Sequence, residues 1–162
     1  YYTLTTPAGQ TVGAAVQGGG EITSFNSIDP GTIPTNAPGK RPANSDMPHG
    51  LFGLNLAVPN PGGQVVVVIV LPEAAPADFG WVKYIEGQGW FDFSNSVTFN
   101  AGRTEAFLTL VDGGPGDADG AANGVIVDPS GPYKKAASPF PPIPGEDDDG
   151  YSSCFVSTLT SN

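Results

Sequence analysis

Gln64-Val65-Val66-Val67-Val68-Ile69-Val70-Leu71 contains the longest apolar run of the chain, and almost every residue in it is β-branched. Continuous β-branched runs bounded by turn residues are typical of strands inside a sheet. We therefore expect a central strand here, buried on both faces. Seven apolar residues are far fewer than a membrane-spanning helix needs, so the sequence predicts no transmembrane segment in this chain.

Shorter strand patterns lie on both sides of this run, and turn-forming pairs such as Asp112-Gly113 and Ala101-Gly102 separate them. No segment of ten residues carries a helical apolar stripe. Regularly spaced short strands with frequent turns indicate an all-β fold, an immunoglobulin-like antiparallel β-sandwich with an extended C-terminal arm. The expected strands cover residues 1–6, 21–28, 51–58, 64–71, 81–85, 90–93, 96–100, 104–111 and 124–127.

The C-terminal part differs in composition from the rest of the chain. Residues 1–132 are predicted to form the sandwich, and residues 133–150 a stiff Pro-rich linker ending in the acidic run 146–149. Residues 151–162 regain strand character, with Tyr151, Phe155 and Leu159 on one side of the expected strand. A strand-like tail beyond a stiff linker can fold back or pair with another molecule.

The charge balance restricts the partners. Formal net charge is -10, and the six Lys and Arg residues are scattered along the sequence. A protein that binds nucleic acid needs clustered basic residues, so that class is excluded. Low charge content, abundant Gly and Pro, and a start at Tyr1 without Met favour a secreted, extracellular protein whose leader has been removed.

The stretch from Leu110 to Pro129 joins two expected strands through a loop rich in Asp and Gly. Carboxylate and amide oxygens at this density are the ligands that calcium prefers, although the spacing does not match an EF-hand. The alternative is a hairpin in which Asp and Asn bind their own backbone through Asx-turns. The candidate calcium ligands are Asp112, Asp117, Asp119, Asn123 and Asp128.

Enzymatic signatures are weak, so we expect a protein without catalytic residues. His49 is the single histidine, and the Gly-x-Ser-x-Gly motif is absent. Trp81 and Trp90 flank a Gly-rich turn, so one of them is a candidate sugar-stacking residue, with packing in the core as the alternative. Lys83, in an expected strand, also permits an internal isopeptide crosslink, but no local motif specifies a partner.

Three stretches in order resemble the bacterial choice-of-anchor U surface domain. They are Met47-Pro48-His49-Gly50-Leu51-Phe52, the segment 68–84 with its Leu71-Pro72-Glu73-Ala74-Ala75 and Trp81-Val82-Lys83-Tyr84 motifs, and the segment 111–128. The segment containing Cys154-Phe155-Val156 resembles a variant of the Cys-Phe-Ile box of some exported proteins. The resemblance implies export and attachment to the cell surface through a C-terminal anchor, and it implies no catalytic activity.

These observations together predict a non-catalytic, extracellular structural or cell-surface protein. The sharper hypothesis is self-association into fibres by strand addition, with residues 151–160 or 1–6 placed against the sheet edge of a neighbouring subunit. Other surface proteins or glycans are the alternative partners. A calcium-dependent or carbohydrate-binding adhesive module is the alternative. Cys154 has three possible fates, as a lipid anchor, a disulfide to a neighbour or a free thiol. The residues expected to serve assembly or anchoring are Tyr151, Cys154, Phe155 and Leu159.

Overall fold

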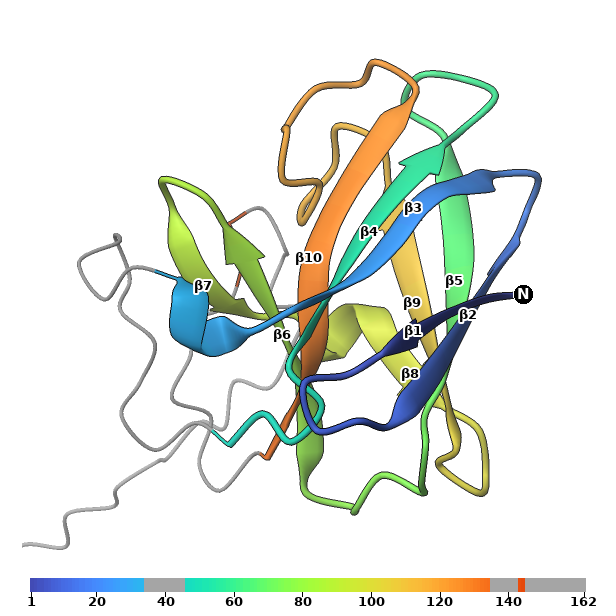
Figure 1. Ribbon diagram of the computed structural model, residues 1–162. Coiled ribbons are helices and arrows are strands. Elements are labelled where there is room, and N and C mark those ends of the chain that lie inside the picture. The colour runs from blue at the N-terminus through green and yellow to red at the C-terminus, as the bar shows by residue number, and fades with distance from the viewer. Residues whose placement is uncertain (34–45, 135–142, 145–162) are drawn as a thin grey trace, which may run out of the picture.

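The computed structural model describes residues 1–33, 46–134 and 143–144 and shows ten β-strands (Figure 1). Two three-residue 3-10 turns, Pro30–Thr32 and Ser94–Ser96, are the only helical segments in this described part. Neither has the length or apolar character needed to cross a bilayer. The strands are β1 (Tyr2–Thr5), β2 (Thr11–Gln17), β3 (Glu21–Ile28), β4 (Leu51–Ala57), β5 (Gln64–Val70), β6 (Phe79–Ile85), β7 (Gly89–Asp92), β8 (Val97–Phe99), β9 (Glu105–Val111) and β10 (Val125–Lys134).

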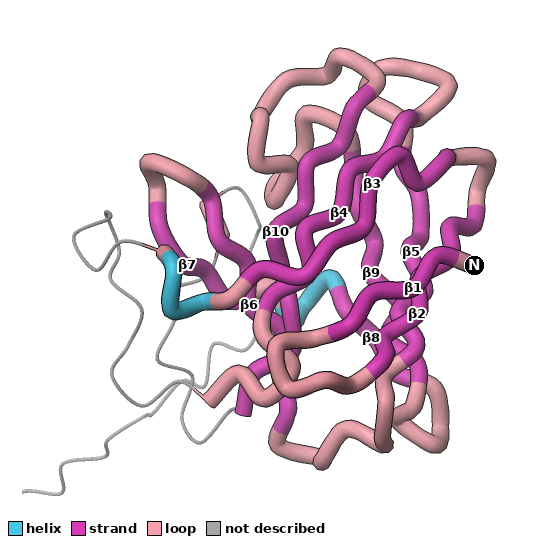
Figure 2. The backbone as a smooth tube through the Cα atoms, in the orientation of Figure 1, coloured by secondary structure: helices cyan, strands magenta, loops and turns pink. Residues whose placement is uncertain are grey.

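The strands form two antiparallel sheets of five strands, with the orders β1-β2-β5-β9-β8 and β3-β4-β10-β6-β7. Figure 2 shows the two layers with strands throughout and loops at both ends of the sandwich. The prediction of an all-β antiparallel sandwich is confirmed. The expected C-terminal arm, including Tyr151, Cys154, Phe155 and Leu159, lies outside the described residues.

Strand β5 is the middle strand of its sheet, as its sequence predicts. Val65, Val67 and Ile69 are buried in the core between the sheets, where they meet side chains of the opposite sheet such as Leu54 and Ile126. On the outer face only Val68 is buried, while Val66 and Val70 are half-buried. The expected burial on both faces is therefore complete only on the inner one.

Strand β10 is the middle strand of its sheet and connects its two halves. It pairs with β4 over Val125–Ser130 and with β6 over Ser130–Lys134, so its partner on the described ladder changes at Ser130. In Figure 1 it runs the length of the sandwich, and the β6–β7 hairpin lies beside its C-terminal half. The sequence predicted a strand only as far as Val127, because Pro129, Gly131 and Pro132 are typical strand breakers.

Strand β2 was not predicted, because Gly13, Ala14 and Ala15 weaken its β-propensity. Its pairing with both β1 and β5 stabilises it in the fold. Beyond β10, the side chain of Ile143 is buried in the core between the sheets. This contact brings part of the Pro-rich segment onto the sandwich.

Candidate functional site

Asp112 follows β9 and connects three parts of the chain. Its carboxylate accepts hydrogen bonds from the backbone N–H groups of Gly62 and Gly124, both at 2.8 Å, and of Asn123 at 3.3 Å. Burial alone would raise the pKa of Asp112, but these backbone N–H groups outweigh that effect and lower it. The side chain thus joins the β4–β5 turn to the loop between β9 and β10.

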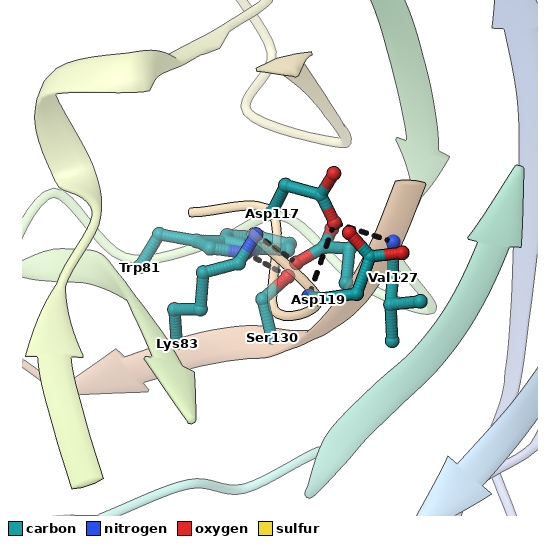
Figure 3. A network of polar contacts seen from close by, with 7 residues as sticks. Trp81, Lys83, Asp117, Asp119, Val127 and Ser130 are labelled. Atoms are coloured by element: carbon teal, nitrogen blue, oxygen red, sulfur yellow. Dashed lines mark hydrogen bonds and ion pairs between the residues drawn. The ribbon is translucent and has the colours of Figure 1, made fainter. Parts of the chain in front are cut away.

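Asp117 occupies the middle of the same loop and is almost fully buried. It accepts from the N–H groups of Gly113 at 2.9 Å, Val127 at 3.0 Å and Asp119 at 3.4 Å. Burial raises the pKa of this carboxyl group more than the backbone hydrogen bonds lower it. Because Val127 belongs to β10, the Asp117 side chain fastens the loop against that strand (Figure 3).

Asp119 and Asn123 are exposed and form local turns. Asp119 accepts from the N–H of Ala121, two residues ahead, and Asn123 accepts from the N–H of Val125 in the same way. The Asn123 amide also donates to Asp119 at 3.1 Å. These are the Asx-turns of the alternative interpretation of this loop.

Asp128, the fifth predicted ligand, pairs with a lysine of β6 and not with the other four candidate ligands. It lies on β10 with its side chain in the core, and its Oδ1 is 2.8 Å from Nζ of Lys83 on β6. Both side chains are essentially fully buried, at 0% and 1% exposure. Figure 3 shows the side chains of Trp81 and Lys83 extending from β6 toward β10, where Trp81 donates to Ser130 at 2.9 Å.

The structure therefore does not bring the five predicted ligands together at one point. Among the described residues, no group of three or more His, Cys, Asp and Glu side chains is arranged to hold a metal ion. Each of the five instead has a partner within the protein. The calcium site stays a prediction, and the internal role of these side chains is what their hydrogen bonds show.

Both tryptophans are buried, Trp81 completely and Trp90 at 3% exposure. Trp81 stacks obliquely near Phe52 in the core, and Trp90 packs against Tyr84 on the outer face of the sheet. Neither ring offers a free face for a sugar, so the alternative of packing is the one observed.

His49 is also buried, and its Nδ1 lies 2.8 Å from Oε1 of Gln10. Burial lowers the pKa of His49, and the charge of Glu73 partly offsets this. A pocket beside His49 is lined by Glu73, Asp78 and Lys134 among others. The contact between His49 and Gln10 joins the segment just before β4 to the turn between β1 and β2.

Sequence reasoning did not identify the pairing of Lys83 with Asp128. Strand alternation does contain the signal, because Lys83 lies between Trp81 and Ile85, both on the core face of β6. Asp128 likewise follows core-facing Ile126 by two residues. The predicted strand ended at Val127, however, and it is the part of β10 from Ser130 onward that pairs with β6.

No protein-family model, no curated protein and no solved structure matches this chain. The resemblance to the choice-of-anchor U surface domain accordingly stays an expectation based on the residues quoted above.

Proposed function

We propose that this chain is a non-catalytic structural protein of the bacterial cell surface, exported and self-associating by strand addition between subunits. The observation that supports the proposal is that each sheet ends in strands with a single partner among the described residues. Strands β1 and β8 end one sheet, and β3 and β7 end the other. An edge strand presents unpaired backbone N–H and C=O groups and is a template for a strand from another chain.

Strand β3 is the strongest acceptor candidate because it is the longest of these edges, with eight residues. It pairs with β4 on one side, and its register shifts between Ile22 and Ser24. A bulge of this kind weakens regular pairing near the start of an edge. The acceptor segment is therefore Phe25–Ile28, where the register with β4 is regular.

The hydrogen bonds of the buried carboxylates also support a structural role for this protein. Asp112 and Asp117 bind backbone N–H groups of the sandwich, and Asp128 pairs with Lys83. The backbone hydrogen bonds of Asp112 and Asp117 stabilise the domain, as a structural subunit requires. In this proposal the strand donor is the tail 151–160, where Phe155 and Leu159 supply apolar side chains.

Electron microscopy of the full chain tests the proposal with two tail variants. Phe155→Pro removes a backbone donor from the middle of the tail strand and prevents regular pairing. Ser161→Pro makes the same kind of change beyond that strand and is the matched control. We expect fibres from the unchanged chain and from Ser161→Pro, and none from Phe155→Pro. Fibres from all three proteins, or from none of them, would contradict strand addition by the tail.

Calcium binding is the second candidate, and the exposed pair of Asp119 and Asn123 favours it. Their side-chain oxygens lie in one turn, and the charge of Asp119 contributes to the raised pKa of Asp117. A cation would relieve that repulsion. If calcium binds the folded state, added calcium raises the melting temperature and a chelator reverses the change. Equal melting temperatures with calcium and with chelator would rule out this candidate.

A further inference from the structure

Lys83 and Asp128 face each other across two neighbouring strands. In the ladder between β6 and β10, Lys83 stands opposite Ser130, and Asp128 is the preceding core-facing residue of β10. The strands are held on both sides, since β6 also pairs with β7 and β10 also pairs with β4. The Nζ and Oδ1 atoms are therefore kept at 2.8 Å by rigid elements.

The surroundings of the pair are apolar and closed. Lys83 Nζ lies 4.6 Å from the centre of the buried Phe93 ring, and a Cβ on Gly116 would approach it to 3.1 Å. Apart from their 2.8 Å contact with each other, neither Nζ nor Asp128 Oδ1 has a hydrogen-bond partner in the described part of the chain. Two charges in such a place lose the solvation of water and gain few compensating contacts.

We propose that Lys83 and Asp128 condense into an intramolecular amide that joins β6 covalently to β10. This site of modification does not depend on the proposed assembly, because a monomer can carry the same crosslink.

The reaction balances without an oxidant or a co-reactant. A proton passes from the Lys83 ammonium to the Asp128 carboxylate, which gives a neutral amine and a carboxylic acid. The Nζ lone pair attacks Cγ of Asp128, the C–N bond forms, and the C–OH bond breaks. The departing hydroxyl takes a proton from the nitrogen and leaves as water, so one ammonium and one carboxylate become one amide and one water.

Proximity and burial both favour this condensation. Well-oriented groups in one molecule react as if present at about 10⁵ M or more, which compensates for the weak reactivity of a carboxylic acid. The product carries no charge, so it removes the desolvation cost of the ion pair. Nζ lies 2.8 Å from Oδ1, an oxygen bonded to the Cγ atom that it would attack, so the two reacting groups are already neighbours.

The pair is specific among the groups that the structure describes. Lys83 is the buried lysine in this part of the chain, whereas Lys134 is exposed. Asp112 and Asp117 are buried acids too, but their carboxylate oxygens accept backbone hydrogen bonds. Asp128 is the acid whose oxygen faces a lysine.

The intact mass of the full chain, measured under denaturing conditions, tests the proposal. We expect the purified protein to be lighter than its sequence mass by one water molecule. Lys83→Met and Asp128→Ala should both show their full sequence mass. Asp119→Ala is the matched control, since it makes the same change at an exposed acid, and it should lose one water like the unchanged chain.

Tryptic digestion identifies the bond. An amide at Lys83 blocks cleavage there, so the segment 41–103 stays whole and remains attached to the segment 104–134. A full intact mass with release of the fragment 41–83 would overturn the proposal. Loss of water with separate fragments would overturn it as well, because it would locate the dehydration elsewhere, such as a succinimide at an Asp-Gly pair.

Discussion

Two aspartates of this protein accept hydrogen bonds from backbone N–H groups of the loop between β9 and β10 and of neighbouring segments. Asp112 and Asp117 each accept three backbone N–H groups, and those of Asp112 come from two different loops. Buried N–H groups without a partner are costly, so a carboxylate that satisfies several of them is worth more than an ordinary surface acid. The aspartates between β9 and β10 are therefore explained by the backbone N–H groups that they bind.

Replacing Asp117 by Ala should destabilise the fold by roughly 3 kcal/mol, because three backbone N–H groups lose their acceptor. Asp119→Ala is the control and should cost less than about 1 kcal/mol, since that side chain is exposed. Urea unfolding followed by Trp fluorescence measures both values. Equal losses for the two variants would show that the loop does not depend on its buried carboxylate.

His49 should make stability depend on pH. Burial lowers its pKa in the folded state, so the unfolded chain binds a proton more readily, and stability falls as pH drops through the ordinary histidine pKa of about 6.5. The loss is at most about 1.4 kcal/mol per pH unit for one proton. Urea unfolding at several pH values should show a smaller decrease for His49→Gln than for the unchanged chain. The same pH dependence in both proteins would mean that His49 titrates normally.

At the scale of elements, β10 determines how the second sheet is built. It lies between β4 and β6, and its core face supplies both Asp128 and Ser130 to the polar contacts with β6. Tyr133, at its end, is fully buried and donates from its hydroxyl to Asp92 at 2.8 Å. The strand connects the loop carboxylates at one end with the β6–β7 hairpin at the other.

Gly131 permits the close approach of β10 to β4. A Cβ at this position would lie 2.6 Å from the carbonyl oxygen of Gly50 and 3.2 Å from Cα of Leu51, both backbone atoms. Gly131→Ala should therefore destabilise the protein by about 1–3 kcal/mol. Gly102→Ala, whose Cβ would meet nothing nearer than 3.8 Å, serves as the control in thermal unfolding. An unchanged melting temperature in Gly131→Ala would show that β4 and β10 separate easily.

The sequence predicts most of this architecture because its apolar alternation is regular. The run from Gln64 to Leu71 and the alternation of Phe52, Leu54 and Leu56 indicate strands directly, and both are found. Strand β2 escapes prediction because it is rich in small residues, and β10 is predicted only as far as Val127 because Pro129 and Gly131 follow. Their stability comes from pairing with distant strands, which no local pattern reports.

The candidate site was predictable in its residue types and not in its geometry. The Asp loop is visible in the sequence, but a density of acids does not distinguish cation ligands from acceptors of backbone hydrogen bonds. That distinction depends on which N–H groups the fold brings near, such as Gly62 from the β4–β5 turn at Asp112. The Lys83–Asp128 contact likewise requires the order of strands β6 and β10 in the sheet.

For the whole molecule, net charge opposes self-association, and edge strands that have one partner each among the described residues favour it. Each chain carries a formal charge of -10, so subunits repel one another at low ionic strength. At about 0.15 M salt the screening length falls to about 8 Å, and short-range pairing along an edge such as β3 can prevail. Assembly through strands thus depends on conditions in which the acidic surfaces are screened.

The measurement that tests this account most directly is the molar mass of the full chain by light scattering over a range of protein concentrations at about 0.15 M salt. A structural subunit that adds strands end to end has no closed stoichiometry, so its mass should rise continuously with concentration. A mass that stays at the value of a single chain at every concentration would contradict self-assembly.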